Sequence, residues 1–130
     1  MAKTILVVDD DEIFRSMMGD VLRAAGYNVV LAEDGDRGYE MFVQKQPDLI
    51  VLDLLMPGKT GARLVQSIRQ HAKGKKVPVI MMTGMMGSDA FSLDAVQQWG
   101  VNAFLPKGTD LPVVLRKIRE LTNGVRHSRG

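Results

Sequence analysis

The stretch Thr4-Ile5-Leu6-Val7-Val8-Asp9-Asp10-Asp11 changes from almost wholly apolar to wholly acidic within one residue. A short run of β-branched residues and leucine, without polar alternation, is typical of a parallel strand that is buried on both faces. We therefore predict a strand over residues 4–8 that ends at an acidic run.

The rest of the chain repeats this unit of a short apolar run followed by a helical pattern. In the first helix the apolar sets Ile13/Met17/Val21 and Phe14/Met18/Leu22/Ala25 recur at helical spacing, and in the second Tyr39, Phe42 and Val43 are predicted to face inward. Four further strands are predicted over residues 28–32, 49–52, 78–82 and 102–105. The five helices are predicted to begin after Asp11, at Asp36, after Thr60, after Ser88 or Asp89, and after Asp110.

Strict alternation of strands and helices predicts an α/β fold. Right-handed crossovers and short connections favour a doubly wound, five-stranded parallel sheet in the order 2-1-3-4-5, with five helices on its two faces. The length predicts one domain over residues 1–124 followed by a short basic tail over residues 125–130, with no output domain.

Composition excludes several classes of protein. The chain has no cysteine, which excludes disulfides and thiolate metal sites and fits a cytoplasmic location. No apolar run approaches the roughly 18 residues of a membrane span, and the acidic run follows the first strand where a signal peptide would need its cleavage region. The net charge of +2 is too small to predict nucleic-acid binding.

Polar residues stand where the predicted strands end. Asp9 and Asp10 close the first strand, Asp53 the third and Thr83 the fourth, and Lys107 lies just beyond the fifth. The carboxyl ends of parallel strands share one edge, and the first and third strands are neighbours in the predicted order. We therefore expect three carboxylates to meet in one crevice.

Each of these residues has a simpler interpretation when it is taken alone. Any of residues 9–11 could cap the first helix, Asp53 could cap a turn, Thr83 could satisfy a backbone group, and Lys107 could be a solvated charge. Because all of these residues are expected at one edge of the sheet, a functional cluster is favoured over these separate interpretations.

Electrostatics indicates what this cluster needs. Carboxylates about 5 Å apart repel by roughly 3 kcal/mol per pair at an effective dielectric constant of about 20. Lys107 leaves a charge of about −2, which a divalent cation would balance. The donors are oxygens, and neither His71 nor His127 falls at this edge, so Mg²⁺ is predicted, with Mn²⁺ as an alternative.

A divalent metal, a lysine, a hydroxyl and a spare carboxylate are the components of phosphoryl transfer. Lys107 would neutralise charge on the transferred group, Thr83 would donate a hydrogen bond, and Asp53 is best placed to attack. A carboxylate nucleophile forms an aspartyl phosphate.

Taken together, these segments resemble the receiver domain of two-component response regulators from residue 5 to about residue 121. The motifs that carry the resemblance are Val7-Val8-Asp9-Asp10, Asp53-Leu54-Leu55-Met56-Pro57-Gly58 with Gly61, Val79-Ile80-Met81-Met82-Thr83, and Phe104-Leu105-Pro106-Lys107. The resemblance implies a flavodoxin-like fold with Asp53 as the phospho-acceptor.

The resemblance also implies roles for the surrounding residues. Asp10 would bind Mg²⁺ directly and Asp9 partly through water, with Asp53 and the backbone carbonyl of Leu55 completing the protein ligands. On phosphorylation, Thr83 would move toward the phosphoryl group and Phe104 would rotate inward.

Partners follow from the same resemblance. The phosphoryl group would come from a histidine kinase, a phosphotransfer protein or a small acyl phosphate. The face formed by the fourth helix, fifth strand and fifth helix would then bind a downstream protein that the sequence does not identify. Such a protein is a monomer or a phosphorylation-dependent dimer, and it catalyses only its own phosphorylation and dephosphorylation.

The sequence departs from the family pattern at two positions. Gly108 follows Lys107 where the family usually has proline, and because a cis bond before a non-proline residue costs about 2.5–4 kcal/mol, we expect a trans bond. Gly84 replaces the usual alanine after Thr83, and with Gly87 it flanks Met85-Met86, which indicates a mobile loop near the expected partner surface.

Four other functions are alternatives to a signalling switch that acts by changing its binding to a partner. A phosphorelay intermediate would pass the phosphoryl group from Asp53 to another histidine. A Mg²⁺-dependent phosphohydrolase would need a general acid and a substrate cap, but Leu54 and Leu55 follow Asp53 and no cap insertion is present.

Two binding functions are also disfavoured. Flavin binding would need a hydroxyl-rich phosphate loop after the first strand, and the sequence has none there. DNA binding would depend on the basic residues 126–129 alone.

Overall fold

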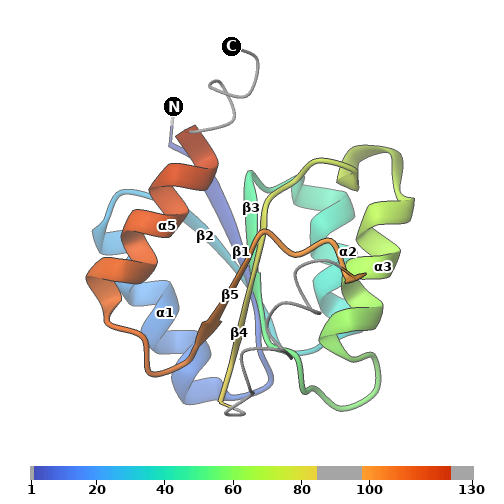
Figure 1. Ribbon diagram of the computed structural model, residues 1–130, viewed down its shortest axis with the longest axis horizontal. Coiled ribbons are helices and arrows are strands. Elements are labelled where there is room, and N and C mark those ends of the chain that lie inside the picture. The colour runs from blue at the N-terminus through green and yellow to red at the C-terminus, as the bar shows by residue number, and fades with distance from the viewer. Residues whose placement is uncertain (1, 85–97, 124–130) are drawn as a thin grey trace.

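The computed structural model describes residues 2–84 and 98–123 of the 130-residue chain. Within them, five parallel strands form one sheet in the order β2-β1-β3-β4-β5 (Figure 1). The strands are β1 (Thr4–Val8), β2 (Asn28–Ala32), β3 (Leu49–Leu52), β4 (Val79–Thr83) and β5 (Ala103–Pro106). The predicted sheet and its strand order are confirmed.

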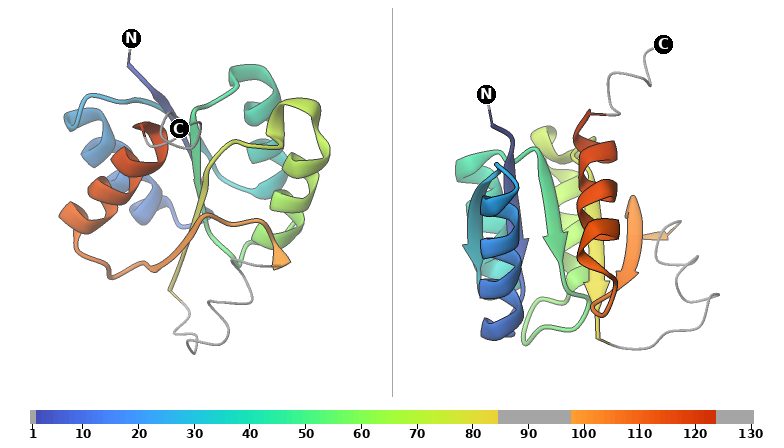
Figure 2. Two further views of the ribbon diagram at one scale, coloured as in Figure 1. Left: turned by 45° about the horizontal axis from the view of Figure 1, so that its top comes forward. Right: turned by 90° about the vertical axis from the view of Figure 1, so that its left-hand side faces the viewer.

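Helices cover both faces of this sheet. The helices are α1 (Glu12–Ala24), α2 (Gly35–Lys45), α3 (Gly61–Gln70) and α5 (Leu111–Asn123), with a 3₁₀ turn η1 at Ala72–Gly74. Figures 1 and 2 show α1 and α5 together on one face and α2 and α3 on the other. None of the helices in the described ranges is long and apolar enough to cross a membrane.

Two predictions lie outside the described residues. The fourth helix, with its cap at Ser88 or Asp89 and the preceding Met85-Met86, falls in the range 85–97. The basic tail at residues 125–130 also lies beyond the described range.

Strand β3 and residues 5–8 of β1 are apolar throughout because helices cover both of their faces. In β1, Leu6 and Val8 pack in the cluster beneath α2 and α3, whereas Ile5 and Val7 pack in the cluster beneath α1 and α5. All four side chains are fully buried. Successive side chains of a strand point to opposite faces, so a strand between two helical layers needs an unbroken apolar run.

The sequence pattern identified the helices better than their inward faces. In α1, Phe14, Met18 and Leu22 are buried, but Ile13 is 83% exposed. In α2, Phe42 is buried, whereas Val43 is 38% exposed, so the predicted inward orientation of Val43 is wrong. The buried side of α2 instead includes two glycines, Gly35 and Gly38, which carry no apolar signal.

Helix ends agree with the local sequence signals. Asp11 caps α1, because its Oδ1 accepts hydrogen bonds from the backbone N–H of Ile13 at 3.0 Å and of Phe14 at 3.3 Å. Gly26 follows α1 with φ of 99°, a backbone conformation that favours glycine. Thr60 caps α3 through a 3.2 Å bond from the Arg63 N–H to its Oγ1.

The ends of β4 and β5 differ from the prediction by one residue. Both strands begin and end one residue later than predicted, because the ladder between them continues to the pair Thr83 and Pro106. No peptide bond within the described residues is cis, which confirms the expected trans geometry at Lys107–Gly108.

Helix α2 packs closely against the sheet at Gly38. A Cβ atom at this position would lie 2.9 Å from both Cγ atoms of Val8 and 3.3 Å from Cδ2 of Leu64. The β-branched Val8 sits in the middle of the core and cannot easily rotate away. The glycine is therefore needed for packing rather than for backbone conformation.

We predict that Gly38→Ala lowers the free energy of unfolding. The overpacking cost of about 1–3 kcal/mol exceeds the gain of about 1 kcal/mol that alanine gives in a helix. Urea unfolding measures the change. Gly19→Ala in α1 is the control, because a Cβ there meets only the ends of the flexible Arg23 and Leu31 side chains, at 3.3 Å. A Gly38→Ala protein as stable as the Gly19→Ala protein would contradict this account of the packing.

Candidate functional site

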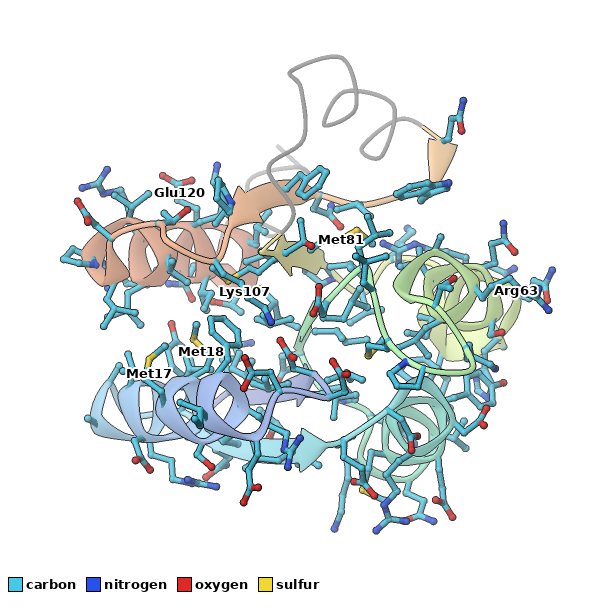
Figure 3. All side chains as sticks on the ribbon, turned by 90° about the horizontal axis from the view of Figure 1, so that it is seen from below. Met17, Met18, Arg63, Met81, Lys107 and Glu120 are labelled. Carbon is cyan, nitrogen blue, oxygen red and sulfur yellow. The ribbon has the colours of Figure 1, made fainter. Side chains whose placement is uncertain are left out.

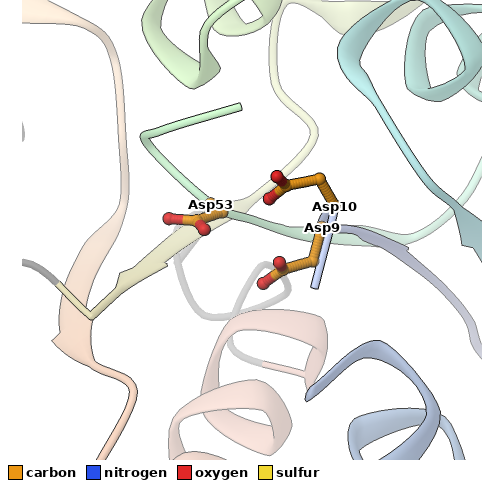
Figure 4. A group of neighbouring side chains, drawn as sticks. All are labelled: Asp9, Asp10 and Asp53. Atoms are coloured by element: carbon orange, nitrogen blue, oxygen red, sulfur yellow. The ribbon is translucent and has the colours of Figure 1, made fainter. Parts of the chain in front are cut away.

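The carboxyl ends of the strands form an acidic edge, seen face-on in Figure 3. The backbone N–H of Asp9 donates to Ala32 O, and that of Asp53 donates to Val8 O, both at 3.1 Å. Both aspartates therefore continue the sheet ladder by one residue, which fixes where their side chains start. Carboxylate oxygens of Asp9, Asp10 and Asp53 all lie within 4.8 Å of one another (Figure 4).

Burial distinguishes the three acids. Asp9 is 1% exposed and Asp53 is 6% exposed, whereas Asp10 faces solvent. Oδ1 of Asp9 accepts a 2.9 Å hydrogen bond from the backbone N–H of Asp11, and the guanidinium of Arg15 donates to the Asp9 carbonyl at 2.7 Å. Asp9 is thus fixed at the bottom of the site, with Asp10 at its rim.

Lys107 joins the two buried carboxylates. Its Nζ lies 2.9 Å from Oδ2 of Asp9 and 3.1 Å from Oδ2 of Asp53. The residue follows β5, and its backbone N–H donates to the carbonyl of Thr83 at 3.0 Å. The lysine predicted for this edge is therefore located between the acids, and its ammonium is the cation that links them.

The pKa values of Asp9 and Lys107 are both shifted by burial and by their contact at this edge. Burial raises the pKa of the Asp9 carboxyl above its ordinary value of 3.8, and the bonds from Asp11 and Lys107 offset this only in part. For Lys107, burial alone would lower the pKa, but its bonds to Asp9 and Asp53 outweigh burial and raise it. Lys107 is therefore charged at neutral pH, and the cost of burying the Asp9 carboxylate is offset only in part.

The remaining predicted residues lie around this centre. Thr83 ends β4 and is 2% exposed. Leu55 is 54% exposed, and its backbone N–H donates to Oδ1 of Asp53 at 3.4 Å. Phe104 lies in the middle of β5, paired with Met81, and packs against the cluster beneath α2 and α3 rather than at the carboxylates. Thr83 and Leu55 therefore lie at the same edge of the sheet as the carboxylates, whereas Phe104 lies two residues before the end of β5.

The loop that carries Asp53 is held close to α3 at Gly61. The Gly61 N–H donates to the Leu54 carbonyl at 2.9 Å, and a Cβ at residue 61 would lie 2.2 Å from the Asp53 carbonyl oxygen. No larger residue fits there without moving the Asp53 backbone. The glycine that followed the acidic motif in the sequence therefore sets the position of the acid.

Sequence reasoning missed one contact of the site. Phe14 was assigned only to the apolar face of the first helix, yet Nζ of Lys107 lies 4.5 Å from the centre of its ring. The available signal was its place on the first turn of the helix that follows the acidic strand end. The rotation of that turn, which brings the ring to Lys107, could not be derived from spacing.

The donor set suits a hard divalent cation. Three carboxylates and one ammonium leave a formal charge of about −2, and all candidate ligand atoms are oxygens. The raised pKa of Asp9 is independent evidence that its buried charge is incompletely compensated. The residues present therefore could hold a metal ion.

Known proteins share this sequence pattern. Residues 5–119 match the family model for the response regulator receiver domain. The chain is 34% identical over 119 residues to the DNA-binding dual master transcriptional regulator RpaA of Synechocystis sp., an alignment that covers 90% of this chain and 48% of that protein. The chain spans about half or less of the length of the curated relatives that it matches first.

Solved structures share the fold. The chemotaxis protein CheY4 of Vibrio cholerae, at 26% identity, matches with a TM-score of 0.86 over 93% of this chain and 99% of that chain. The BeF3-activated N-terminal receiver domain of Klebsiella pneumoniae RstA, at 28% identity, matches with a TM-score of 0.82 over 92% of this chain and 97% of that chain.

We predict that Asp9→Asn stabilises the metal-free protein at pH 7. Because the folded state binds the Asp9 proton more tightly than the unfolded chain, the wild type loses stability as the pH rises from 3.8 through the raised pKa. Asparagine removes this loss, and the advantage disappears below pH 3.8, where the carboxyl is neutral in both states.

Chemical unfolding in the presence of a chelator, at neutral and acidic pH, measures the effect. Asp10→Asn is the matched control, because Asp10 is exposed and its substitution changes stability less. An Asp9→Asn protein that is less stable than the wild type at pH 7 would show that the buried charge of Asp9 does not lower stability. Equal stabilisation at both pH values would show that the effect of the substitution does not come from ionisation of Asp9.

Proposed function

The chain belongs to the response regulator receiver domain family, whose members are signalling switches, and we propose that Asp53 is its phospho-acceptor. The observation that carries the proposal is the arrangement of Asp53, with Lys107 3.1 Å from Oδ2 and a second buried acid on the other side of the ammonium. A nucleophilic carboxylate, a fixed cation and further acidic ligands are what transfer of a phosphoryl group to an aspartate requires.

The proposed reaction is an in-line displacement on phosphorus. An oxygen of the Asp53 carboxylate attacks the phosphoryl group, the phosphorus–nitrogen bond of a donor phosphohistidine breaks, and the imidazole leaves. An acyl phosphate forms on Asp53. Lys107 stabilises the charge on the phosphoryl oxygens because its ammonium is already fixed beside Asp53.

Metal binding is part of the proposal. Asp9, Asp10, Asp53 and the backbone carbonyl of Leu55 would hold Mg²⁺, or Mn²⁺ in its place. When bound, the ion would supply positive charge to the phosphoryl oxygens. The charge of about −2 at the carboxylates supports a divalent ion over a monovalent one.

Switching would use Thr83 and Phe104. Thr83 ends β4 at the acidic edge, so its hydroxyl is suited to bond a phosphoryl oxygen. Phe104 pairs with Met81 on the neighbouring strand and is partly buried against the cluster beneath α2 and α3, so an inward turn would bury more of its ring. We propose that this movement changes the affinity of the face around β5 and α5 for a protein partner.

The proposed partners are a phosphodonor and a downstream protein. A histidine kinase or a phosphotransfer protein would supply the phosphoryl group to the domain at residues 1–124. DNA binding appears in the name of RpaA, of which this chain matches 48%. The downstream partner that we propose for the domain is a protein whose binding depends on phosphorylation, and the net charge of +2 gives no support for direct nucleic-acid contact.

A phosphorelay intermediate is the second candidate, because the same site would also serve reverse transfer to a histidine. Incubation of the phosphorylated protein with a phosphotransfer domain separates the two functions: return of the phosphoryl group supports a relay. Turnover of phosphate monoesters would instead indicate a phosphohydrolase.

We predict that acetyl phosphate with Mg²⁺ phosphorylates the wild type and that Asp53→Asn abolishes the modification. An amide is not a nucleophile toward phosphorus at neutral pH, so intact mass should rise by one phosphoryl group only in the wild type. Beryllofluoride, the activating mimic in the RstA structure, should likewise bind only the wild type. Retained labelling of the Asp53→Asn protein would place the acceptor elsewhere.

We predict that Lys107→Ala slows phosphorylation by at least about tenfold while divalent metal affinity is unchanged or higher. The substitution removes charge stabilisation from the transferred group, and it also removes a cation that shares the Asp9 and Asp53 carboxylates. Calorimetric metal titration and labelling kinetics measure the two effects separately.

Lys117→Ala is the matched control, because Lys117 lies on α5 in an exposed pair with Glu120. Circular dichroism should show a retained fold in both variants. Wild-type labelling kinetics in Lys107→Ala, or a parallel loss of metal binding, would remove Lys107 from its proposed role.

A further inference from the structure

Phe14 is fixed at the start of α1, next to the acidic edge. It lies in the first turn, and its backbone N–H donates to the capping carboxylate of Asp11 at 3.3 Å. Its side chain is 8% exposed and belongs to the apolar cluster that includes Met18 and Leu22. The cap and the cluster together hold the ring in one orientation.

The ring of Phe14 borders the ammonium of Lys107. Nζ lies 4.5 Å from the ring centre, within the distance of a cation–π interaction. The same ammonium contacts Asp9 at 2.9 Å and Asp53 at 3.1 Å, so two carboxylates and one aromatic face surround it. Figure 3 shows Lys107, just after β5, pointing toward the side of α1, the helix that carries Met17 and Met18.

These three neighbours of the ammonium differ in how the reaction changes them. Asp53 becomes an acyl phosphate and loses its carboxylate charge. A cation held by Asp9 and Asp53 would compete with Lys107 for the carboxylate oxygens of these two residues. The quadrupole of a phenyl ring depends on neither event. The ring is therefore the neighbour of Lys107 that stays the same before, during and after transfer.

We propose that Phe14 is a positioning residue that holds the Lys107 ammonium in place for phosphoryl transfer. This inference rests on the proposed function of Asp53. The ring acts through Lys107 and does not touch the phosphoryl group. Its role is electrostatic, which distinguishes it from the packing that any apolar residue of similar volume would supply at this position.

Fluorination separates the electrostatic role from packing, because added fluorine atoms weaken the ring quadrupole with little change in shape. Site-specific replacement of Phe14 by mono-, di- and trifluorophenylalanine in the full chain gives a graded series. Labelling of Asp53 by acetyl phosphate with Mg²⁺ should slow steadily along the series, by roughly two- to thirtyfold in total. Circular dichroism should show a retained fold along the series.

Two further variants and a control complete the test. Phe14→Leu should slow labelling and shift the Lys107 ε-methylene proton resonances by removing the ring current, whereas Phe14→Trp, which keeps an aromatic face, should restore part of the rate. The same fluorinated series at Phe42 is the control, because Phe42 packs in the opposite cluster, against His71. Its rates should not change.

The outcomes distinguish this inference from the proposed function. Equal labelling rates along the Phe14 series, an unshifted Lys107 resonance in Phe14→Leu, or an equal slope at Phe42 would overturn the positioning role alone. Absence of any labelling in the wild type would instead overturn the proposed function of Asp53, and the Lys107 resonance would still report whether the ring contacts the ammonium.

Discussion

Two almost fully buried carboxylates, Asp9 and Asp53, share a single ammonium at the edge of the sheet, and the site depends on this arrangement. At separations of about 5 Å and an effective dielectric constant of about 20, each pair of carboxylates repels by roughly 3 kcal/mol. Burial also raises the pKa of the Asp9 carboxyl, and its bonds from Asp11 and Lys107 offset this only in part. An edge that lacks positive charge is suited to attract a divalent cation and to keep a carboxylate available for chemistry.

The fold supports this costly arrangement with the rest of the sheet. Apart from Thr4, strands β1 and β3 are apolar and covered on both faces, so burial of their side chains stabilises the backbone that presents the two acids. Gly38 and Gly61 let α2 and α3 approach the sheet and the Asp53 loop closely. Among the described residues, the buried charged groups Asp9 and Asp53 lie together at the carboxyl edge, and such departures from the local rules of folding concentrate at functional sites.

The sequence predicted the sheet well because its signals are local and redundant. Apolar runs without alternation indicated buried parallel strands, and topology rules then placed residues 9, 10, 53, 83 and 107 at one edge. The unequal burial of Asp9 and Asp10 was not predictable, because adjacent residues give the same signal. The exposure of Val43 and the contact between Phe14 and Lys107 depend on helix rotation, which spacing does not fix to within one residue. The roles of Thr83 and Phe104 rest on the family resemblance and stay predictions.

Paramagnetic broadening by Mn²⁺, followed in the amide NMR spectrum of the full chain, tests the central arrangement most directly. If the acids from β1 and β3 form one metal site, substoichiometric Mn²⁺ should first broaden the amides of residues 9–11 and 53–55, and an excess of Mg²⁺ should reverse the effect. Broadening that begins elsewhere, or that affects the residues after β1 and those after β3 at different metal concentrations, would contradict a single shared site.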